Sequence, residues 1–464
     1  MAVAKDDSIE VPTPDSMHQT GAGVELRHKI LHYAQERIDL DPAPLDGPKS
    51  PADLFALAGN TITEAGLGGE KSLEIFAEVL APSTISTDHP NYLSFIPAAP
   101  TELATLFDLV VSASSIYGGS WMEGAGAVYA ENQVLRLLAD ECGLGENAGG
   151  LFVQGGTLGN LSALVTAREK AINELGEHKW AIICSSESHS SIKSVAKVMG
   201  VKTFAGDAGS SGSLSKAAAA KAIQDAQDSG YTPFAIVGTA GTTNFGILDD
   251  LHGIAELAKE HSLWFHVDGA YGLAGILVPE LKHLYTGVEH ADSFIVDPHK
   301  WLYAPFDACA LVYAEPKYAK AAHTQHGEYL EILNDSGDFN PSDYAVNLTR
   351  RVRGLPLWFS MASHGVGAYR TAIASNVDLA HRIAKEIQDR GYLRLVRNPQ
   401  LSVVVFERIG WDTKDYEDWS AKLLSDQFAF VVPSSHQGKT NTRFAIVNPT
   451  TKYEDLLTIL DSME

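Results

Sequence analysis

The stretch ADSFIVDPHKWLYAPFDACALVY, residues 291–313, contains the features from which the fold can be inferred. The apolar run Ser293–Val296 is followed at once by Asp-Pro, and a second apolar run, Ala308–Tyr313, comes shortly after. Because proline cannot pair inside a sheet, it ends the first strand and places the following residues on a loop. Lys300 is therefore predicted at the carboxyl end of a buried strand, where open α/β sheets bind their ligands.

Further apolar runs of strand length alternate with helical patterns on the amino-terminal side of this stretch. The expected strands are Gly150–Val153, Trp180–Cys184, Phe234–Val237 and Trp264–Val267. The expected helices are Leu103–Ala113, Val128–Asp140, Gly159–Glu174, Leu214–Gln227 and Leu251–His261. Strands that alternate with crossover helices predict an α/β fold with a mostly parallel sheet covered on both faces.

The carboxyl-terminal part of the chain has a different pattern. After a long helical stretch it carries short apolar runs and a closing helix, which together predict a small α+β domain. These segments are Leu357–Asp389, Leu393–Val396, Leu401–Phe406, Phe428–Val432, Thr442–Val447 and Tyr453–Ser462.

The amino-terminal part is predicted to form helices that cannot bury their apolar faces alone. These begin near Val24 and continue at Pro51–Leu57 and Ser72–Leu80, so we expect them to pack on another subunit. The expected division of the chain is a flexible N-terminus at 1–23, an N-terminal helical dimerisation segment at 24–101, a large domain at 102–356 and a small C-terminal domain at 357–464.

Composition excludes several classes of protein. The chain has 464 residues, 45% hydrophobic and 20% charged, which is ordinary globular composition. A net charge of −23 argues against a nucleic-acid partner. The three cysteines, Cys142, Cys184 and Cys309, are too few and scattered for a disulfide framework or a zinc site, so we expect no metal. No apolar stretch reaches the roughly 20 residues of a membrane span, and the polar N-terminus lacks the apolar core of a signal peptide. We therefore expect a cytoplasmic protein with no membrane partner.

Two side chains at expected strand ends suit chemistry on a small molecule. Lys300 lies between His299 and Trp301, and we expect partial desolvation and the imidazole to lower its pKa, as suits a nucleophile that forms a Schiff base. An isolated His-Lys pair is more often part of a surface turn. Asp268 ends the run LWFHVD and could hold the protonated ring nitrogen of pyridoxal phosphate, or could cap a helix.

Three further stretches carry weaker signals. In GGLFVQGGTLGNLSAL a strand leads through a glycine turn to a helix, so Gly156, Thr157 and Asn160 could bind a phosphate. His189 follows a strand among small polar residues, where it could stack on an aromatic cofactor or lie in a solvated loop. The hydroxyl of Thr243 and those of two nearby threonines could hold a carboxylate, or belong to an ordinary turn.

Together and in this order, these stretches resemble the group II pyridoxal-phosphate-dependent decarboxylases of fold type I. That family includes decarboxylases of aromatic amino acids, tyrosine, histidine, glutamate and 2,4-diaminobutyrate. The resemblance extends from about His89 to Val447, and its most specific part is HVDGAY at 266–271 combined with PHKW at 298–301. It implies an aspartate aminotransferase-like fold, pyridoxal 5′-phosphate (PLP) as the cofactor, and a homodimer with active sites at the subunit interface.

The resemblance also implies roles for individual residues around the cofactor ring. Lys300 forms the Schiff base with the cofactor, and Asp268 pairs with the ring nitrogen with support from Thr243. His189 stacks on one face of the ring, and Ala270 lies under the other.

Other matches concern the phosphate and the reaction type. Gly156 and Thr157 match the phosphate site, with His299 near it. In the loop HTQHGEYLEILNDSGDFNPSDY, Tyr329 matches a tyrosine that returns a proton to the substrate carbon after carbon dioxide leaves. Relatives that make aldehydes often replace this tyrosine by phenylalanine, or the stacking histidine by asparagine. This chain keeps both His189 and Tyr329, which favours decarboxylation to an amine.

The identity of the substrate is less defined. Phe95, Ile96, Trp121 and Thr349 match family positions near the substrate and suit an aromatic or large apolar amino acid. An acid at the position of Glu123 resembles the glutamate and diaminobutyrate branches of the family, and it could bind a basic group of the substrate. We favour a structural role for Glu123.

Several alternatives stay open at this point. The chain could decarboxylate an acidic or basic amino acid, or it could be a decarboxylation-dependent aldehyde synthase or an aminotransferase. It could also be a catalytically idle scaffold that retains the fold. Intact Lys300, Asp268 and His189 argue against the last of these.

Overall fold

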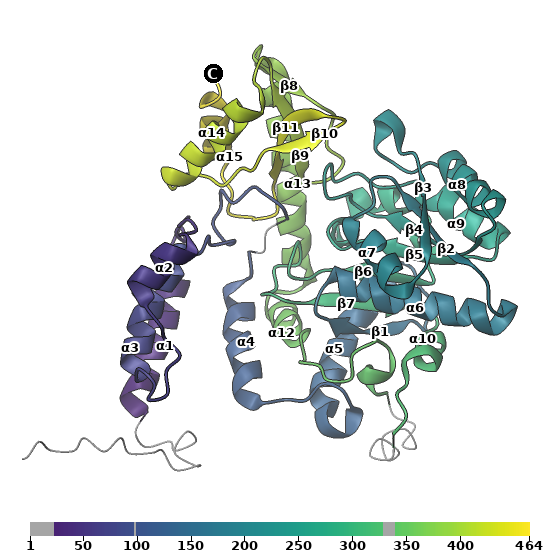
Figure 1. Ribbon diagram of the computed structural model, residues 1–464, viewed down its shortest axis with the longest axis horizontal. Helices are drawn as coiled ribbons and strands as arrows, with labels where there is room; N and C mark the ends of the chain where they lie inside the picture. Colours follow the sequence, from purple (N-terminus) through teal and green to yellow (C-terminus); the bar gives the residue numbers. More distant parts are fainter. Residues whose placement is uncertain (1–22, 97–98, 328–338) are drawn as a thin grey trace, which may run out of the picture.

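The computed structural model describes residues 23–96, 99–327 and 339–464, and its centre is a seven-stranded sheet (Figure 1). The strands are β1 (Gly149–Val153), β2 (Trp180–Ser185), β3 (Lys202–Gly206), β4 (Thr232–Thr239), β5 (Trp264–Asp268), β6 (Ser293–Val296) and β7 (Cys309–Tyr313). Their order is β1-β7-β6-β5-β4-β2-β3. β7 runs antiparallel to β1 and β6, whereas the pairs from β6 to β3 are parallel. The predicted mostly parallel α/β sheet is confirmed.

Helices cover both faces of this sheet. They are α5 (Trp121–Glu141), α6 (Gly156–Leu175), α7 (Ser190–Met199), α8 (Lys216–Asp228), α9 (Leu251–Glu260) and α10 (Pro316–His323). Successive residues of β6 enter different apolar clusters, with Phe294 and Val296 on one side and Ile295 on the other. Because both faces of the sheet are buried, the sequences of the central strands are continuous apolar runs. Edge strand β3 is only partly buried, and its mixed sequence gave no such signal.

A second, antiparallel sheet of order β10-β11-β9-β8 lies near the carboxyl terminus. This part contains α12 (Leu355–His364), α13 (Val366–Asp389), β8 (Leu393–Leu395), β9 (Val403–Arg408), α14 (Thr413–Ser425), β10 (Ser434–His436), β11 (Lys439–Ala445) and α15 (Tyr453–Asp461). The expected strand at Phe428–Val432 is wrong. Phe430 forms only an isolated bridge with Tyr92, because its backbone bonds to Asn91 and Leu93 instead of to a strand of this sheet.

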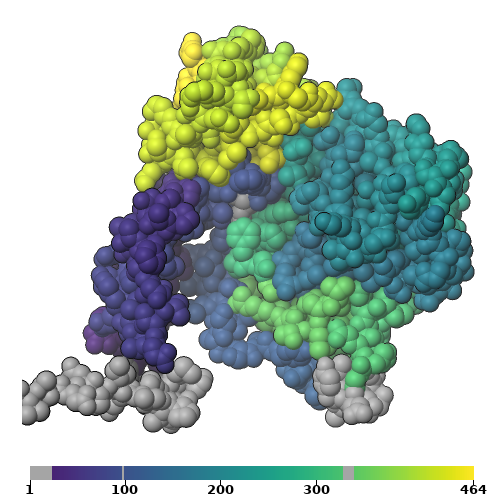
Figure 2. All heavy atoms as spheres, in the orientation of Figure 1, coloured from purple at the N-terminus to yellow at the C-terminus, as the bar shows by residue number. Residues whose placement is uncertain are grey.

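The N-terminal helices lie against the small domain at their upper end, and below this contact a gap separates them from the main body (Figures 1 and 2). They are α1 (Val24–Ile38), α2 (Pro51–Ala58) and α3 (Gly69–Ile75), which continues as a π-helical turn at Phe76–Leu80 and a short 3-10 turn at Ala81–Ser83. No residue of α1 or α2 is buried. A cavity of about 750 Å³ separates the end of α1 from Tyr303 and Tyr369 of the main body.

The remaining helices are α4 (Glu102–Ser114) and short 3-10 turns at Gly209–Ser211, Gly272–Leu277, Pro279–Tyr285, Val288–His290 and Pro341–Asp343. Within the described ranges, every helix is too short or too polar to cross a bilayer.

A buried ion pair ties α5 to the segment that leads into α12. Arg350 donates to the Glu131 carboxylate at 2.6 Å and to the carbonyl oxygen of Gly118 at 2.6 Å. The second Glu131 oxygen accepts from the Gly354 amide at 2.8 Å. Both side chains are almost fully buried, so each charge depends on the other for compensation.

We therefore expect Arg350→Ala to lower the free energy of unfolding by about 3–5 kcal/mol, because it leaves the Glu131 carboxylate buried without its cation. Chemical denaturation followed by far-ultraviolet circular dichroism measures this change. Lys414→Ala is the control, because the Lys414–Asp418 pair is exposed and its removal should leave the unfolding midpoint nearly unchanged. Equal effects of the two substitutions would contradict a structural role for the buried pair.

Candidate active site

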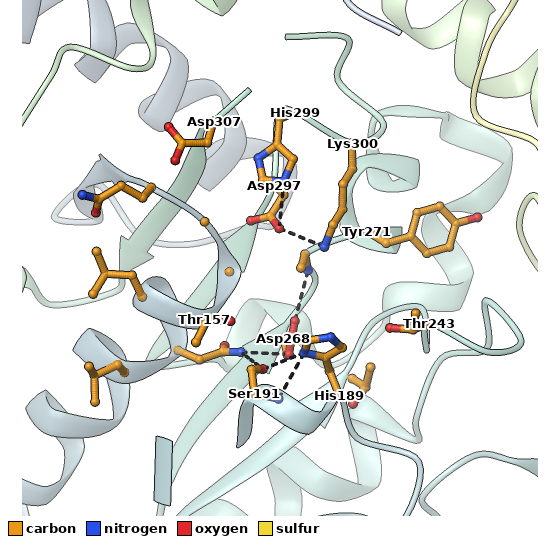
Figure 3. Close-up of a pocket in the computed structure, with 18 of the residues that line it drawn as sticks. Thr157, His189, Ser191, Thr243, Asp268, Tyr271, Asp297, His299, Lys300 and Asp307 are labelled. Atoms are coloured by element: carbon orange, nitrogen blue, oxygen red, sulfur yellow. Dashed lines mark hydrogen bonds and ion pairs between the residues drawn. The ribbon is translucent and has the colours of Figure 1, made fainter. Parts of the chain in front are cut away.

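The carboxyl ends of β4, β5 and β6 open into a cavity of about 500 Å³ (Figure 3). All the residues that the sequence assigned to a cofactor line this one cavity: Gly156, Thr157, His189, Thr243, Asp268, Ala270, His299 and Lys300. Its volume lies within the usual range for small-molecule and cofactor sites. The strand ends therefore bring together residues that are separated by more than a hundred positions in the sequence.

Asp268 is the last residue of β5, and it is 5% exposed. One carboxylate oxygen accepts from Asn160 Nδ2 at 3.0 Å, and the other accepts from the Ala270 amide at 3.2 Å. N–H donors of this kind favour the ionised form of a carboxylate. Asp268 therefore presents a negative charge to the cavity.

The structure corrects one of two expectations around Asp268. Asn160, which we expected at a phosphate, bonds to Asp268 instead. Thr243 lines the cavity, but the described hydrogen bonds to Asp268 come from Asn160 and Ala270, and the Thr243 carbonyl oxygen accepts from Arg443. The turn after β4 thus directs the Thr243 backbone toward the small sheet.

Behind Asn160 lie three residues that sequence reasoning did not place in the site. The side-chain oxygen of Asn160, Oδ1, lies 2.8 Å from His266 Nε2, and His266 Nδ1 lies 2.8 Å from Ser293 Oγ. Trp264 Nε1 donates to the same Ser293 oxygen at 2.8 Å. A signal did exist in the sequence, because Trp264, His266 and Asp268 alternate along β5 and so project from the same face of the sheet.

Lys300 lies in the turn after β6, as predicted, but its electrostatic setting differs from the expected one. Its Nζ lies 2.9 Å from a carboxylate oxygen of Asp297, which is 2% exposed. Burial of Lys300 disfavours the ammonium form, but the Asp297 carboxylate outweighs this effect, and the pKa of Lys300 is raised. The expected lowering of its pKa is therefore wrong.

The neighbours of Lys300 explain this result. Trp301 points away from the lysine, because its fully buried indole stacks on Tyr271 at 5.1 Å and donates to Asn376 at 3.0 Å. His299 is not the expected cation, because burial lowers its pKa. Its Nδ1 lies 2.7 Å from the Ala308 carbonyl oxygen.

The glycine turn closes the other end of the cavity. Gly155 precedes α6, and Gly156 is the first residue of this 20-residue helix. A Cβ atom at Gly156 would lie 3.2 Å from Asp297 Oδ2 and 3.3 Å from the Ala270 methyl group, so a side chain here would crowd both neighbours. Free N–H groups at the start of a long helix suit an anion such as a phosphate.

His189 caps α7 at the edge of the same cavity. Its Nδ1 accepts from the Ser191 amide at 3.2 Å and lies 2.9 Å from the Ser191 hydroxyl (Figure 3). Because Nδ1 accepts, the ring proton of neutral His189 resides on Nε2.

The expected substrate residues do not line this cavity in the same chain. Phe95 is 58% exposed and Thr349 is also exposed, whereas Ile96 packs at the edge of the main core. Trp121 begins α5, and its backbone amide donates to Asn340 at 3.0 Å. Tyr329 lies outside the described residues.

Glu123 takes part in the start of α5. The Ser120 hydroxyl caps this helix by accepting from the Glu123 amide at 3.2 Å, and it donates to the Glu123 carboxylate at 2.8 Å. These contacts agree with the structural role that we favoured for Glu123.

Residues 51–409 match the family model described as the pyridoxal-dependent decarboxylase conserved domain. The chain belongs to this family. It is 29% identical to the aromatic-L-amino-acid decarboxylase of Bacillus atrophaeus, over 86% of each chain. It is 28% identical to the 4-hydroxyphenylacetaldehyde synthase of Rhodiola rosea, over 85% of this chain and 83% of the relative. The crystal structure of Oryza sativa TDC with PLP and tryptamine has the same fold, with a TM-score of 0.89 over 98% and 99% of the two chains at 22% identity.

The decarboxylase is therefore a PLP-dependent carboxy-lyase, and its cavity fits that cofactor. It offers an amine to an aldehyde at Lys300, a buried carboxylate to a pyridine nitrogen at Asp268, and helix N–H groups to a phosphate at Gly156. One Asp297 oxygen is buried without a hydrogen-bond partner among the described residues, so this polar wall can accept a further donor.

We expect Asp297→Asn to increase the rate at which Lys300 reacts with added PLP near pH 7.5. Without the Asp297 charge the pKa of Lys300 falls, and each unit of decrease raises the neutral, nucleophilic fraction about tenfold. Stopped-flow absorbance at several pH values measures this rate.

Asp307→Asn is the matched control for that measurement. Asp307 lines the same cavity but pairs with Arg353 at its rim, so its removal should leave the reaction of Lys300 nearly unchanged. A rate for Asp297→Asn that equals or falls below that of the unmodified enzyme at every pH would contradict the assigned ion pair.

Proposed function

We propose that this decarboxylase converts an aromatic L-amino acid to the corresponding amine and carbon dioxide. The observation that carries the proposal is the convergence of the Lys300 amine, the Asp268 carboxylate and His189 on one cavity at the strand ends. The aromatic preference is supported by the relative from Bacillus atrophaeus, which is named for aromatic amino acids.

When bound, PLP supplies a ring that accepts the electron pair left by the departing carboxylate group. Asp268 would hold the proton on the ring nitrogen, because Asn160 and Ala270 donate hydrogen bonds to its carboxylate. Lys300 would hold the cofactor through its amine and would give up this position to the substrate amine.

Orientation decides which bond is broken. Gly156 and Thr157 would hold the phosphate, with His299 beside it, and would so limit rotation of the ring. Ala270 and His189 line the same cavity and would contact the ring, with His189 Nε2–H available as a donor. These contacts would orient the substrate so that the bond to its carboxylate group is the one that breaks.

For the final proton transfer we assign Tyr329, which would return a proton to the substrate α-carbon. The support for this role is its match to the family tyrosine at this place in the sequence.

We further propose that the enzyme works as a homodimer. In this arrangement Phe95, Ile96, Trp121 and Thr349 serve the cavity of the partner, and Thr243 supports the ring end of its own cavity. Large apolar side chains that a single chain leaves exposed support the dimer, and they include Phe55, Leu57 and Ile62 near α2 and Leu106, Leu109 and Val110 on α4.

The proposed domains are those expected from the sequence: helical dimerisation residues 24–101, a large domain at 102–356 and a small domain at 357–464. We also propose a cytoplasmic location. The buried, unpaired state of Cys142, Cys184 and Cys309 supports it.

The function is tested with a panel of L-amino acids: aromatic ones, glutamate, 2,4-diaminobutyrate and valine. We expect an aromatic member to give carbon dioxide and its amine in equal amounts, without hydrogen peroxide. Lys300→Ala should abolish turnover, because the covalent attachment site is lost. Carbon dioxide release from glutamate or diaminobutyrate alone would contradict the aromatic preference.

Tyr329→Phe tests the reaction type in the same assay. Without its proton donor the enzyme should release carbon dioxide and an aldehyde, with consumption of oxygen and formation of ammonia and hydrogen peroxide. Aldehyde and peroxide from the unmodified enzyme would mean that it is an aldehyde synthase. An unchanged amine product from Tyr329→Phe would overturn the role of Tyr329.

The dimer is tested by analytical ultracentrifugation of Leu109→Glu. Leu109 is 50% exposed on α4, and a charge placed in an apolar interface should convert dimers to monomers and reduce turnover at low protein concentration. Val198→Glu is the control, because Val198 is 71% exposed on α7, away from α4. A monomeric unmodified enzyme with full activity would contradict the proposal.

A further inference from the structure

A continuous chain of four hydrogen bonds runs through the protein interior to Asp268. It passes from Trp264 to Ser293 at 2.8 Å, from Ser293 to His266 at 2.8 Å, from His266 to Asn160 at 2.8 Å and from Asn160 to Asp268 at 3.0 Å. Each of these residues is at most 5% exposed, so water cannot replace any link.

The acceptor at the far end of the chain sets the direction of the bonds. The ionised Asp268 carboxylate can only accept, so Asn160 Nδ2 donates to it and Asn160 Oδ1 faces His266 as an acceptor. His266 then carries its ring proton on Nε2, and its Nδ1 accepts from the Ser293 hydroxyl. The Trp264 indole N–H donates to a lone pair of Ser293 and so holds this hydroxyl in place.

A branch of the chain reaches His189. Asn160 Nδ2 also lies 3.1 Å from the Ser191 hydroxyl, which lies 2.9 Å from His189 Nδ1. If Asn160 donates, Ser191 accepts from it and donates onward to His189. The Asn160 amide group therefore contacts Asp268 directly and His189 through Ser191.

We propose that Trp264, Ser293 and His266 are positioning residues, which act through Asn160 to keep Asp268 ionised against the ring nitrogen of the cofactor. This inference rests on the proposed role of Asp268. It assigns a function to buried residues that never touch the substrate.

The opposite tautomer of His266 would reverse the chain of hydrogen bonds. If His266 carried its proton on Nδ1, the Asn160 amide would turn over, and its oxygen would face the Asp268 carboxylate. Two acceptors in contact in a buried setting favour a protonated carboxyl group, which could no longer hold the ring proton. Burial lowers the pKa of His266, so the ring is neutral and has a single proton to place.

Other titratable groups surround the end of the chain without entering it. Lys300 and Cys309 interact electrostatically with Asp268, and both also interact with Asp297. Substitutions at Trp264 or Ser293 keep these side chains, because Trp264 and Ser293 are the first residues of β5 and β6, at the opposite ends of the strands from Asp268 and Lys300.

The test uses Trp264→Phe and Ser293→Ala in the PLP-loaded, full-length enzyme. The readout is the midpoint of the pH titration of the cofactor's visible absorbance, which reports the bond between Lys300 and PLP. A ring nitrogen that loses its proton withdraws fewer electrons, so we expect this midpoint to rise by about half a pH unit or more. PLP affinity should fall about threefold to tenfold in the same variants, because a charge-assisted hydrogen bond to the ring nitrogen is weakened.

Trp180→Phe is the matched control. Trp180 is also a buried tryptophan at the start of a strand, β2, and its indole N–H has no hydrogen-bond partner among the residues described. We expect it to change the titration midpoint and PLP affinity little. Equal midpoints for Trp264→Phe and Trp180→Phe would overturn the inference.

Selective nitrogen-15 labelling of histidine in the unmodified enzyme gives a second test that does not depend on any variant. The chain requires His266 to be protonated at Nε2 and unprotonated at Nδ1, and the opposite tautomer would overturn the inference. If the unmodified enzyme bound no PLP, the proposed function would fail as well. If it bound PLP and only the tryptophan comparison failed, the proposed function would stand.

Discussion

The buried carboxylate of Asp268 is the constraint on which the rest of the site depends. A negative charge at the end of a central strand is costly unless donors and cations surround it. The donors come from α6 through Asn160 and from the turn after β5 through the Ala270 amide. Because β5 and β6 are neighbouring parallel strands, the turn that carries Lys300 lies at the same sheet edge. The order of the strands thus places the amine and the carboxylate in one cavity.

Asp297 is a second buried acid in the site, and it lies at the opposite end of the cavity from Asp268. Asp297 pairs with Lys300 and packs against the glycine turn, whereas Asp268 lies at the other end beside His189. The two carboxylates follow adjacent strands, and each has its own set of neighbours. The Asp268 carboxylate suits a basic nitrogen at one end of a ligand, and the N–H groups at the start of α6 suit an anionic group at the other. PLP has these two groups.

Much of this site could be predicted from sequence, because its residues follow short buried strands. The apolar runs before Asp268 and Lys300 located β5 and β6, and the glycine turn located the start of α6. Contacts between distant segments could not be predicted in the same way. The pKa of Lys300 depends on its ion pair with Asp297, and the orientation of the Trp301 side chain depends on its hydrogen bond to Asn376 in α13. The segment at Phe428–Val432 failed as a strand because residues near Tyr92 took its backbone bonds.

The proposed role of an ionised Asp268 is to hold a proton on the cofactor ring, and nitrogen-15 magnetic resonance measures this proton directly. The full-length enzyme would be loaded with PLP labelled at the ring nitrogen, and the chemical shift would be followed with pH. We expect the shift of a protonated pyridine nitrogen from about pH 6 to pH 9, well above the titration range of a pyridine in water. The shift of an unprotonated nitrogen at neutral pH would contradict it.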